Sequence, residues 1–273
     1  MLKVDLHTHT TISDGRLDPA ALVRAIATSG LDYFSITDHD TMGMYLQYGA
    51  LLETFGNKVI SGVEVSTFGE GREVHILGYG LPVGPATLDG VLTDRRLARH
   101  NRAALIVQKL QDMGVTISMS DVEGKAQGGM IGRPHIARVL VENGVARDVS
   151  DAFDRYIGSA CPAFVPSSTL TPVAAIRAIN ECGGVSVLAH PTRNKAEELL
   201  ENLVHKGLRG VEAYSTSHTA HDAQRLRAIA HKHNLVMTAG TDFHGPTDLN
   251  PLPGCEVDDD DLRGFLELVR ARA

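Results

Sequence analysis

The sequence predicts an α/β fold in which seven strands alternate with helices around a parallel sheet, either open or closed into a barrel. Three observations support this prediction. Short apolar runs typical of buried strands recur along the chain, and most are followed by a stretch with helical signals. Two helix starts are marked by a capping residue and a proline, at Asp18-Pro19 and Thr171-Pro172. Several apolar runs end in histidine or a carboxylate, as strands do at the active-site face of barrel enzymes.

The individual elements follow from these signals in chain order. The first helix is expected from Pro19 to Gly30, the next starts at Thr41, and a long charged helix is stopped by Gly114. Acidic residues 258–261 suit the positive end of a closing helix. The strands are expected at residues 4–9, 33–37, 58–65, 73–79, 185–189, 210–213 and 235–239. The other helices are expected at residues 89–113, 133–142, 148–156, 172–182, 195–206 and 220–233.

The alternation of strands and helices is interrupted in the middle of the chain. Short helical pieces separated by glycines replace it there, without a convincing core strand. We therefore expect a barrel domain made of residues 1–100 and 168–273. Residues 101–167 are expected to form an inserted helical lobe that covers the active site. The chain shows no internal repeat and no low-complexity linker.

Composition limits the possible functions. The 273 residues are 43% hydrophobic and 22% charged, which is ordinary for a globular protein, and no apolar run reaches the length of a membrane span. The three scattered cysteines and the absence of a leader pattern predict a cytoplasmic protein with reduced thiols. The net charge of −7 and the aromatic content of 5% argue against a binder of long nucleic acids. We expect no membrane association and no obligate protein partner.

The first strand ends in two histidines, and these raise the question of a metal site. His7 and His9 lie two residues apart, so on a strand their imidazoles point to the same face and can hold one ion. Asp242 and His244 form a second such pair after the last strand. Glu64 lies within an apolar strand, where a carboxylate needs a partner. The candidate ligands are His7, His9, Asp14, His39, Glu64, His75, His190, Asp242 and His244.

Each candidate also has a structural interpretation. Asp14 could be a turn residue, residues 38–40 could be a loop that caps a helix, and His75 alone could be a packed core histidine. The joint pattern at successive strand ends favours metal binding. Nitrogen and oxygen donors without cysteine suit Mn²⁺, Zn²⁺, Fe²⁺ or Co²⁺, and nine ligands exceed the needs of one ion. Two to three divalent ions are therefore expected, with Mn²⁺ as the first choice.

The motifs that carry these residues resemble those of the polymerase and histidinol phosphatase (PHP) family of phosphoesterases. They read HTHTTISDG from His7, ITDHD from Ile36, GVEV from Gly62, LAHP from Leu188 and GTDFH from Gly240. The resemblance covers about residues 1–80 and 171–250 and keeps the family's motif order.

The resemblance implies a distorted (β/α)7 barrel with three metals. One metal would be held by His7, His9, Glu64 and Asp242, a second by Glu64, His75 and His190, and a third by Asp14, His39 and His244. With the motif IGRPHIA from Ile131, the layout is similar to the branch that removes the 3′-phosphate of nucleoside 3′,5′-bisphosphates. That activity, such as the conversion of adenosine 3′,5′-bisphosphate to AMP, is the function expected first. Trimming of short RNA from its 5′ end is the alternative.

Residues beyond the metal ligands are expected to bind substrate and to supply a proton. His218 and His135 are candidates for the general acid that protonates the leaving oxygen. A second phosphate on the substrate needs cations outside the metal site. Several of the candidate cations could instead be ordinary solvated charges that bind no substrate. The substrate-binding candidates are Lys125, Arg133, His135, Arg193 and His218.

Three other functions remain open. A histidinol-phosphate-type phosphatase would need an extra acidic group for an amino alcohol. A C–N amidohydrolase on a barrel also begins with two histidines, but its usual bridging lysine is absent here, where Glu64 takes that position. A non-catalytic metal-binding module is disfavoured because all nine candidate ligands are present.

Overall fold

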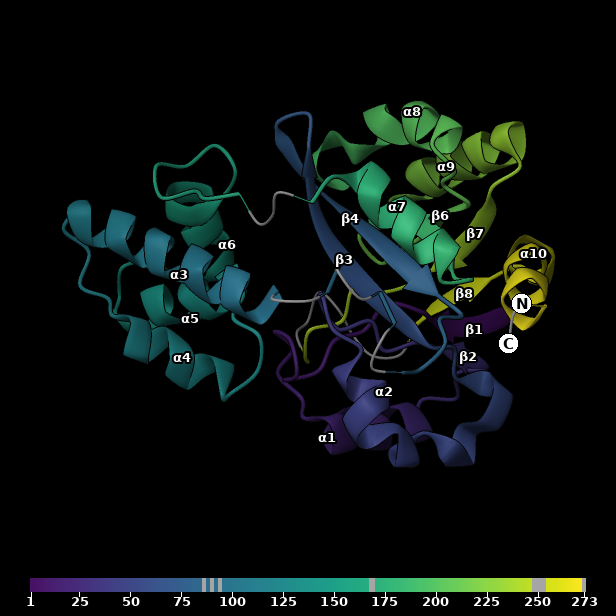
Figure 1. The fold of residues 1–273 in the computed structure, drawn as a ribbon, viewed down its shortest axis with the longest axis horizontal. Helices are drawn as coiled ribbons and strands as arrows, with labels where there is room; N and C mark the ends of the chain where they lie inside the picture. The colour runs from purple at the N-terminus through teal and green to yellow at the C-terminus, as the bar shows by residue number, and fades with distance from the viewer. Residues whose placement is uncertain (85–86, 89–90, 93–94, 167–169, 247–253, 272–273) are drawn as a thin grey trace.

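The strands form two regular sheets (Figure 1). The computed structural model describes residues 1–273 except 85–86, 89–90, 93–94, 167–169, 247–253 and 272–273. The smaller sheet has the order β2-β1-β8, with β1 (Leu2–Asp5), β2 (Tyr33–Phe34) and β8 (Cys255–Val257). The larger sheet has the order β3-β4-β5-β6-β7. Its strands are β3 (Gly62–Gly69), β4 (Arg72–Tyr79), β5 (Val185–Leu188), β6 (Gly210–Tyr214) and β7 (Val236–Ala239).

Backbone contacts connect the edges of the two sheets. Beside β7, the Leu6 amide donates to the Ala239 carbonyl at 2.9 Å, and Thr8 bridges to Phe243. Beside β3, the Ile60 amide donates to the Phe34 carbonyl at 2.9 Å. The predicted α/β class is therefore confirmed. Within the described residues, the regular ladders stop at these two junctions and do not close a barrel.

The prediction of an entirely parallel sheet was wrong at β4. This strand runs antiparallel to both β3 and β5, while β5, β6 and β7 are mutually parallel. The reason is a tight turn at Glu70 and Gly71, whose positive φ angles of 49° and 76° suit a two-residue hairpin and leave no room for a helix. Ser66 pairs with His75 in this hairpin, so Glu64, two residues before Ser66, shares a sheet face with His75.

Helices cover the outside of the sheets, and their starts follow the predicted caps. Asp18 accepts a hydrogen bond from the Ala21 amide at 2.7 Å, and Thr171 accepts one from the Ala174 amide at 3.3 Å. The covering helices are α1 (Pro19–Ala27), α2 (Gly43–Tyr48), α7 (Pro172–Glu181), α8 (Leu200–His205), α9 (Ala220–His233) and α10 (Asp259–Arg270). Three 3₁₀ segments complete them: η1 (Gly49–Leu51), η2 (Glu53–Lys58) and η4 (Arg193–Leu199).

Some predicted boundaries differ from those in the structure. The helix expected from Thr41 begins at Gly43 and soon becomes 3₁₀, and the one expected at 195–206 is half 3₁₀. The start of the helix expected at 89–113 lies partly outside the described residues. The short strand β8 was not predicted; it pairs antiparallel with β1.

A separate group of helices stands beside the sheets (Figure 1). It contains α3 (Arg95–Asp112), α4 (Met119–Ala126), α5 (Arg133–Glu142), α6 (Val149–Ala152) and the π-helical turn η3 (Phe153–Ile157). Their apolar faces share a core of their own, which includes Ile106, Leu110, Val122, Ile136, Leu140 and Ile157. Sequence analysis missed α4, although Ser118 and Asp121 form a capping box at its start. The exact limits of the predicted lobe stay a prediction.

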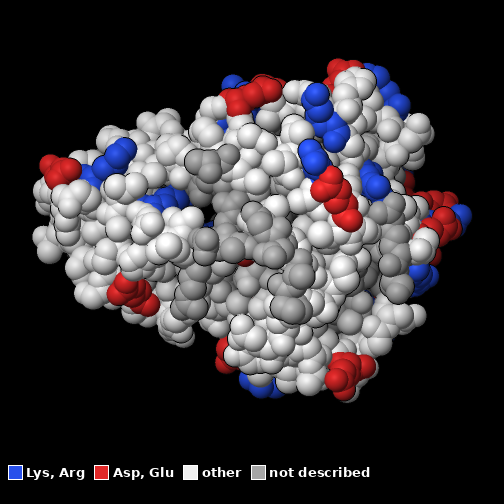
Figure 2. Space-filling model, in the orientation of Figure 1, with Lys and Arg blue, Asp and Glu red and all other residues white. Residues whose placement is uncertain are grey.

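The surface shows no concentration of one charge on the face seen in Figure 2. Acidic and basic side chains are interspersed there, and the surface is hollowed between the helical group and the strands. Because the net charge of the whole chain is −7, an anionic ligand must be attracted locally. Among the described helices, none is both long and apolar enough to cross a bilayer.

Candidate metal centre and cavity

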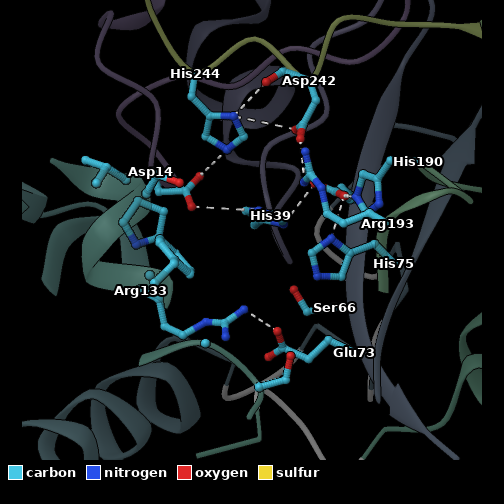
Figure 3. Close-up of a pocket in the computed structure, with 18 of the residues that line it drawn as sticks. Asp14, His39, Ser66, Glu73, His75, Arg133, His190, Arg193, Asp242 and His244 are labelled. Carbon is cyan, nitrogen blue, oxygen red and sulfur yellow. Dashed lines mark hydrogen bonds and ion pairs between the residues drawn. The ribbon is translucent and has the colours of Figure 1, made fainter. Parts of the chain in front are cut away.

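The structure brings all nine predicted ligands to one place. Each comes from the end of a strand or the loop after it, except Glu64 and His75, which lie within β3 and β4. Six of the nine are labelled in Figure 3: Asp14, His39, His75, His190, Asp242 and His244. His190 and Asp242 have positive φ angles of 27° and 54°, which cost roughly 1 kcal/mol each in a residue with a side chain. Such backbone strain is concentrated at functional sites because the surrounding structure must enforce it.

Glu64 lies at the centre of the cluster and is fully buried. Its Oε2 lies 3.2 Å from Nε2 of both His7 and His9 and 3.0 Å from Nδ1 of His39. Its Oε1 lies 2.7 Å from Nδ1 of His75 and 3.0 Å from Nε2 of His190. Burial opposes the charge on Glu64, but the imidazoles, His39 above all, hold its pKa well below the usual range.

The donor atoms fall into three overlapping groups. Within each group they lie no more than 4.8 Å apart, which is close to the spacing of opposite ligands around an ion bound at about 2.1 Å. The groups are His7, His9, Glu64 and Asp242; His39, Glu64 and His75; and His9, Asp14, His39 and His244. The first matches the predicted set. The second contains His39 where His190 was expected, although His190 contacts the same oxygen of Glu64 as His75 does.

The cluster fits divalent cations because several of its buried polar atoms lack a hydrogen-bond partner in the described part of the chain. Among the described residues, five of these atoms have no hydrogen-bond partner, and an unpaired buried polar atom is costly. They are Nε2 of His7, Nε2 of His9, Oδ1 of Asp14, Nδ1 of His39 and Oε2 of Glu64. Nitrogen and oxygen donors of this kind suit Mn²⁺, Zn²⁺, Fe²⁺ or Co²⁺.

Buried carboxylates behind the cluster hold its histidines and loops in place. Glu212 accepts a hydrogen bond from Nδ1 of His7 at 2.9 Å and one from the His190 amide at 2.7 Å. Asp38 accepts from Thr10 and Ser13 in the loop after β1. Sequence analysis missed Glu212, although the signal used for Glu64, a carboxylate inside an apolar strand, is also present in β6.

A cavity of about 760 Å³ opens above the cluster and is lined by many arginines. The predicted Arg133 and Arg193 both line it (Figure 3). Arg193 donates to Oδ2 of Asp242 at 2.9 Å, and Arg133 pairs with Glu73. Sequence analysis missed four further arginines of this cavity, which are Arg16, Arg99, Arg102 and Arg138.

Two of the missed arginines come from one face of the long helix α3. Arg99 donates to Asp40 and Ser66, and Arg102 donates to Glu73 at 2.6 Å. Both are buried, which nothing in a charged helical stretch indicates on its own. Each is held by a carboxylate, so this part of the cavity wall is built from ion pairs.

Three predicted substrate-binding or acid residues lie elsewhere. Lys125 and His135 line a separate cavity of about 160 Å³, where Lys125 pairs with Glu142 at 2.6 Å. His218 bonds to the Ala213 carbonyl at 3.2 Å and is not among the residues that line the large cavity. The structure thus does not bring His135 or His218 to the cavity above the cluster, and the choice of general acid stays a prediction.

The chemistry of His135 adds a reason against its role as an acid. Its Nδ1 accepts a hydrogen bond from the Gly132 amide at 3.0 Å, at the start of α5. Burial lowers the pKa of His135 to about 4, so the ring is neutral at pH 7. The ring serves the start of α5 and has no extra proton to give at neutral pH.

Comparison with known proteins assigns the family. The family model described as the PHP domain matches residues 5–157, which is more than half of the chain. The chain belongs to the PHP family. This PHP protein is therefore a metal-dependent phosphoesterase, a hydrolase.

Relatives and a solved structure agree with this assignment. The PHP protein is 34% identical to the 5′-3′ exoribonuclease Rnm of Escherichia coli, over 89% of this chain and 85% of the relative. It is 30% identical to a 3′,5′-nucleoside bisphosphate phosphatase of Chromobacterium violaceum, over 90% and 88%. A solved structure from Bifidobacterium adolescentis, of a candidate metal-dependent phosphoesterase, superposes with a TM-score of 0.86 at 31% identity and covers 97% of this chain and 96% of its own.

Proposed function

We propose that this PHP protein removes nucleotides from the 5′ end of short RNA by hydrolysing the ester at the ribose 3′ oxygen. The observation that carries the proposal is the ligand cluster at the floor of a cavity that is lined by arginines such as Arg133 and Arg193. The nine ligand residues would hold two to three divalent ions, with Mn²⁺ first. They would do so at one end of a distorted (β/α)7 barrel that the edge contacts between the two sheets would complete.

The order of the two nucleotide activities changes from that expected from sequence. Removal of the 3′-phosphate from nucleoside bisphosphates was expected first, but the exoribonuclease is the more similar relative, at 34% against 30% identity. A cavity of about 760 Å³ is also roomy for one nucleotide, since pockets for whole drug-sized ligands begin near 300 Å³. RNA therefore becomes the main proposal, and the bisphosphate activity becomes the second candidate.

Both activities break the same bond. Water adds to phosphorus, the bond between phosphorus and the ribose 3′ oxygen breaks, and the ribose oxygen gains a proton. Bound divalent cations supply a Lewis acid that makes water nucleophilic at neutral pH and neutralises phosphate charge. Arg133 and Arg193 can each clamp phosphate oxygens with parallel hydrogen bonds. Arg193 also holds Asp242 in position through its contact with Oδ2.

The test is product release by the Mn²⁺-loaded protein from a panel of phosphate esters. The panel contains a 5′-phosphorylated trinucleotide, adenosine 3′,5′-bisphosphate, 3′-AMP, 5′-AMP and histidinol phosphate. We expect 5′-mononucleotides from the trinucleotide, AMP from the bisphosphate, and much slower release from 3′-AMP, which lacks the 5′-phosphate. The Glu64→Gln variant should lose at least about 100-fold in activity because it removes the charge shared by two of the three groups.

Other outcomes would redirect the proposal. Preference for histidinol phosphate, or no nucleotide turnover at all, would refute it. Turnover of the bisphosphate without the trinucleotide would favour the second candidate. Activity that survives exhaustive chelation would contradict the role given to the ligand cluster.

A further inference from the structure

Two arginines lie on the boundary between the large cavity and the small one. Arg16 and Arg138 are the arginines that line both cavities, one of about 760 Å³ and one of about 160 Å³. We propose that Arg16 and Arg138 form a subsite for the phosphodiester that follows the scissile phosphate in an RNA chain. The inference rests on the proposed function and names the length of substrate that the site prefers.

Arg16 is held at the edge of the ligand cluster by a close approach to the backbone. Its amide donates to the His244 carbonyl at 2.7 Å. Its side chain crosses Gly245, where an added Cβ would come within 2.7 Å of Cβ and 3.0 Å of Cδ of Arg16. Gly245 also has a φ of 136°, which favours glycine. A larger residue there would push the Arg16 side chain away, so Gly245 leaves room for the aliphatic part of that side chain.

Arg138 lies on α5. One of its terminal nitrogens, Nη2, donates to the Asp14 carbonyl at 2.8 Å. Asp14 and His244 belong to the same group of candidate ligands. Arg16 is therefore anchored beside His244 through its backbone amide, and the Arg138 guanidinium is anchored beside Asp14.

These two cations differ from the other arginines of the large cavity. Arg99, Arg102, Arg133 and Arg193 each pair with a carboxylate. Within the part of the chain that the structure describes, neither Arg16 nor Arg138 makes an ion pair with a carboxylate. Their charge is therefore available to an anionic ligand, and guanidinium groups bind phosphate oxygens strongly.

The small cavity behind them has the size and polarity for one phosphate. At about 160 Å³ it is below the range of about 300 Å³ or more that encloses a whole small molecule. Lys125 and His135 also line it. Because Nδ1 of His135 accepts from the Gly132 amide, the proton of the neutral ring lies on Nε2, which can donate a hydrogen bond. Lys125 and His135, which were predicted to bind substrate, would then act in this small cavity rather than at the reacting phosphate.

The direction of cleavage decides which phosphate reaches this subsite. When the bond to the ribose 3′ oxygen breaks, the scissile phosphate stays on the departing downstream chain. The first nucleotide and its 5′-phosphate remain among the other arginines. The phosphate beside Arg16 and Arg138 is therefore the next one downstream, which a 5′-phosphorylated dinucleotide lacks and a trinucleotide has.

The experiment compares those two substrates with the Mn²⁺-loaded protein. For the wild type, we expect the trinucleotide to have a KM about tenfold or more below that of the dinucleotide, with similar kcat. Arg16→Gln should remove this advantage and leave the dinucleotide and the bisphosphate unchanged. Arg138→Gln should also remove the advantage of the trinucleotide, measured as the ratio of the two KM values at equal metal content, because Arg138 also contacts the main chain of the ligand residue Asp14. Arg263→Gln is the matched control, since Arg263 is exposed and pairs with Asp260.

Each failure has a separate meaning. If the wild type turns over neither oligonucleotide nor the bisphosphate, the proposed function fails, and this subsite fails with it. If it turns over both oligonucleotides with equal KM, only the subsite is refuted. Arg16→Gln that weakens all three substrates equally would assign Arg16 to the reacting phosphate or the 5′-phosphate and overturn the inference. The inference would also be overturned if both variants kept the wild-type ratio of the two KM values.

Discussion

Oε1 of Glu212 lies 2.9 Å from Nδ1 of His7, and both side chains are fully buried. A carboxylate in this position accepts a hydrogen bond from Nδ1–H, which keeps the proton on Nδ1 and leaves the lone pair of the ring on Nε2. Nε2 of His7 faces Oε2 of Glu64 at 3.2 Å and Oδ1 of Asp242 at 3.4 Å. Glu212 therefore sets the tautomer that metal binding at this group requires, and it aligns His190 through the main chain.

Replacing Glu212 with glutamine tests this relationship at nearly constant shape. The amide oxygen can still accept from the His190 amide, but the amide nitrogen must then donate to Nδ1 of His7. The proton of His7 moves to Nε2 and points at the ligand group. Metal affinity should fall by about 10- to 100-fold. The measurement is metal content against a competing chelator, together with the melting temperature of the metal-free protein.

The control for that experiment is Glu181→Gln, at an exposed residue paired with Arg177. It should change neither metal affinity nor melting temperature. A Glu212→Gln protein that binds metal as tightly as wild type would contradict the tautomer argument. A large loss of melting temperature in the metal-free state would assign Glu212 to the fold instead.

Glu73 supports the cavity wall, and its loss should destabilise the protein. It is buried and pairs with both Arg102 and Arg133. Glu73→Gln leaves two largely buried cations without their carboxylate, which costs about 3 kcal/mol in the free energy of unfolding. Urea denaturation of the metal-free protein measures this loss.

A surface ion pair supplies the comparison for Glu73. Arg72, next in sequence, pairs with Glu198 at 2.8 Å, where the Glu198 side chain is 58% exposed. Glu198→Gln should cost less than about 1 kcal/mol because water and salt screen such pairs. Equal losses for the two variants would mean that the Arg102 and Arg133 charges are compensated by other groups.

The candidate ligands could be predicted from sequence because their positions follow from local rules. The alternation of faces in a strand predicted that His7 and His9 point together. The strand β1 ends earlier than predicted, at Asp5, but both imidazoles still converge on Glu64 from the loop that follows, where the strand ends of an α/β sheet gather such residues. Asp18 and Thr171 marked helix starts through a similarly local rule. The metal roles themselves remain a proposal that the geometry supports.

What sequence analysis missed depends on packing between distant segments. Arg99 and Arg102 read as ordinary charges of a helix, and only the packing of α3 beside β3 and β4 buries them against Ser66 and Glu73. The reversed direction of β4 depends on a two-residue turn between β3 and β4, where the sequence was interpreted as a connection between two parallel strands. His135 was a candidate for the general acid, whereas in the structure its Nδ1 accepts a hydrogen bond at the start of α5.

The pH dependence of activity should not depend on His135. Burial lowers its pKa to about 4, below the usual 6.5. The ring gains a proton only as the pH falls through about 4, so at pH 6 and above it is almost entirely neutral. His135→Gln should therefore give a profile of kcat/KM between pH 6 and 9 that is parallel to that of wild type. Loss of an acidic or basic limb in this range would restore His135 as the proton donor.

Cys255 should be the least reactive thiol at neutral pH. Burial, followed by the nearby charges of Asp5 and Glu212, raises its pKa to about 12. At pH 8 only about one thiol in 10,000 is then the reactive thiolate, and the fraction rises tenfold for each pH unit up to about 12. Cys161, which lines the large cavity, provides the comparison within the same molecule. Mass spectrometry after iodoacetamide treatment at pH 8, 9 and 10 should find Cys255 modified last, with a rate that climbs steeply with pH. A pH-independent rate would mean that local opening, rather than the charge state of the thiol, limits its modification.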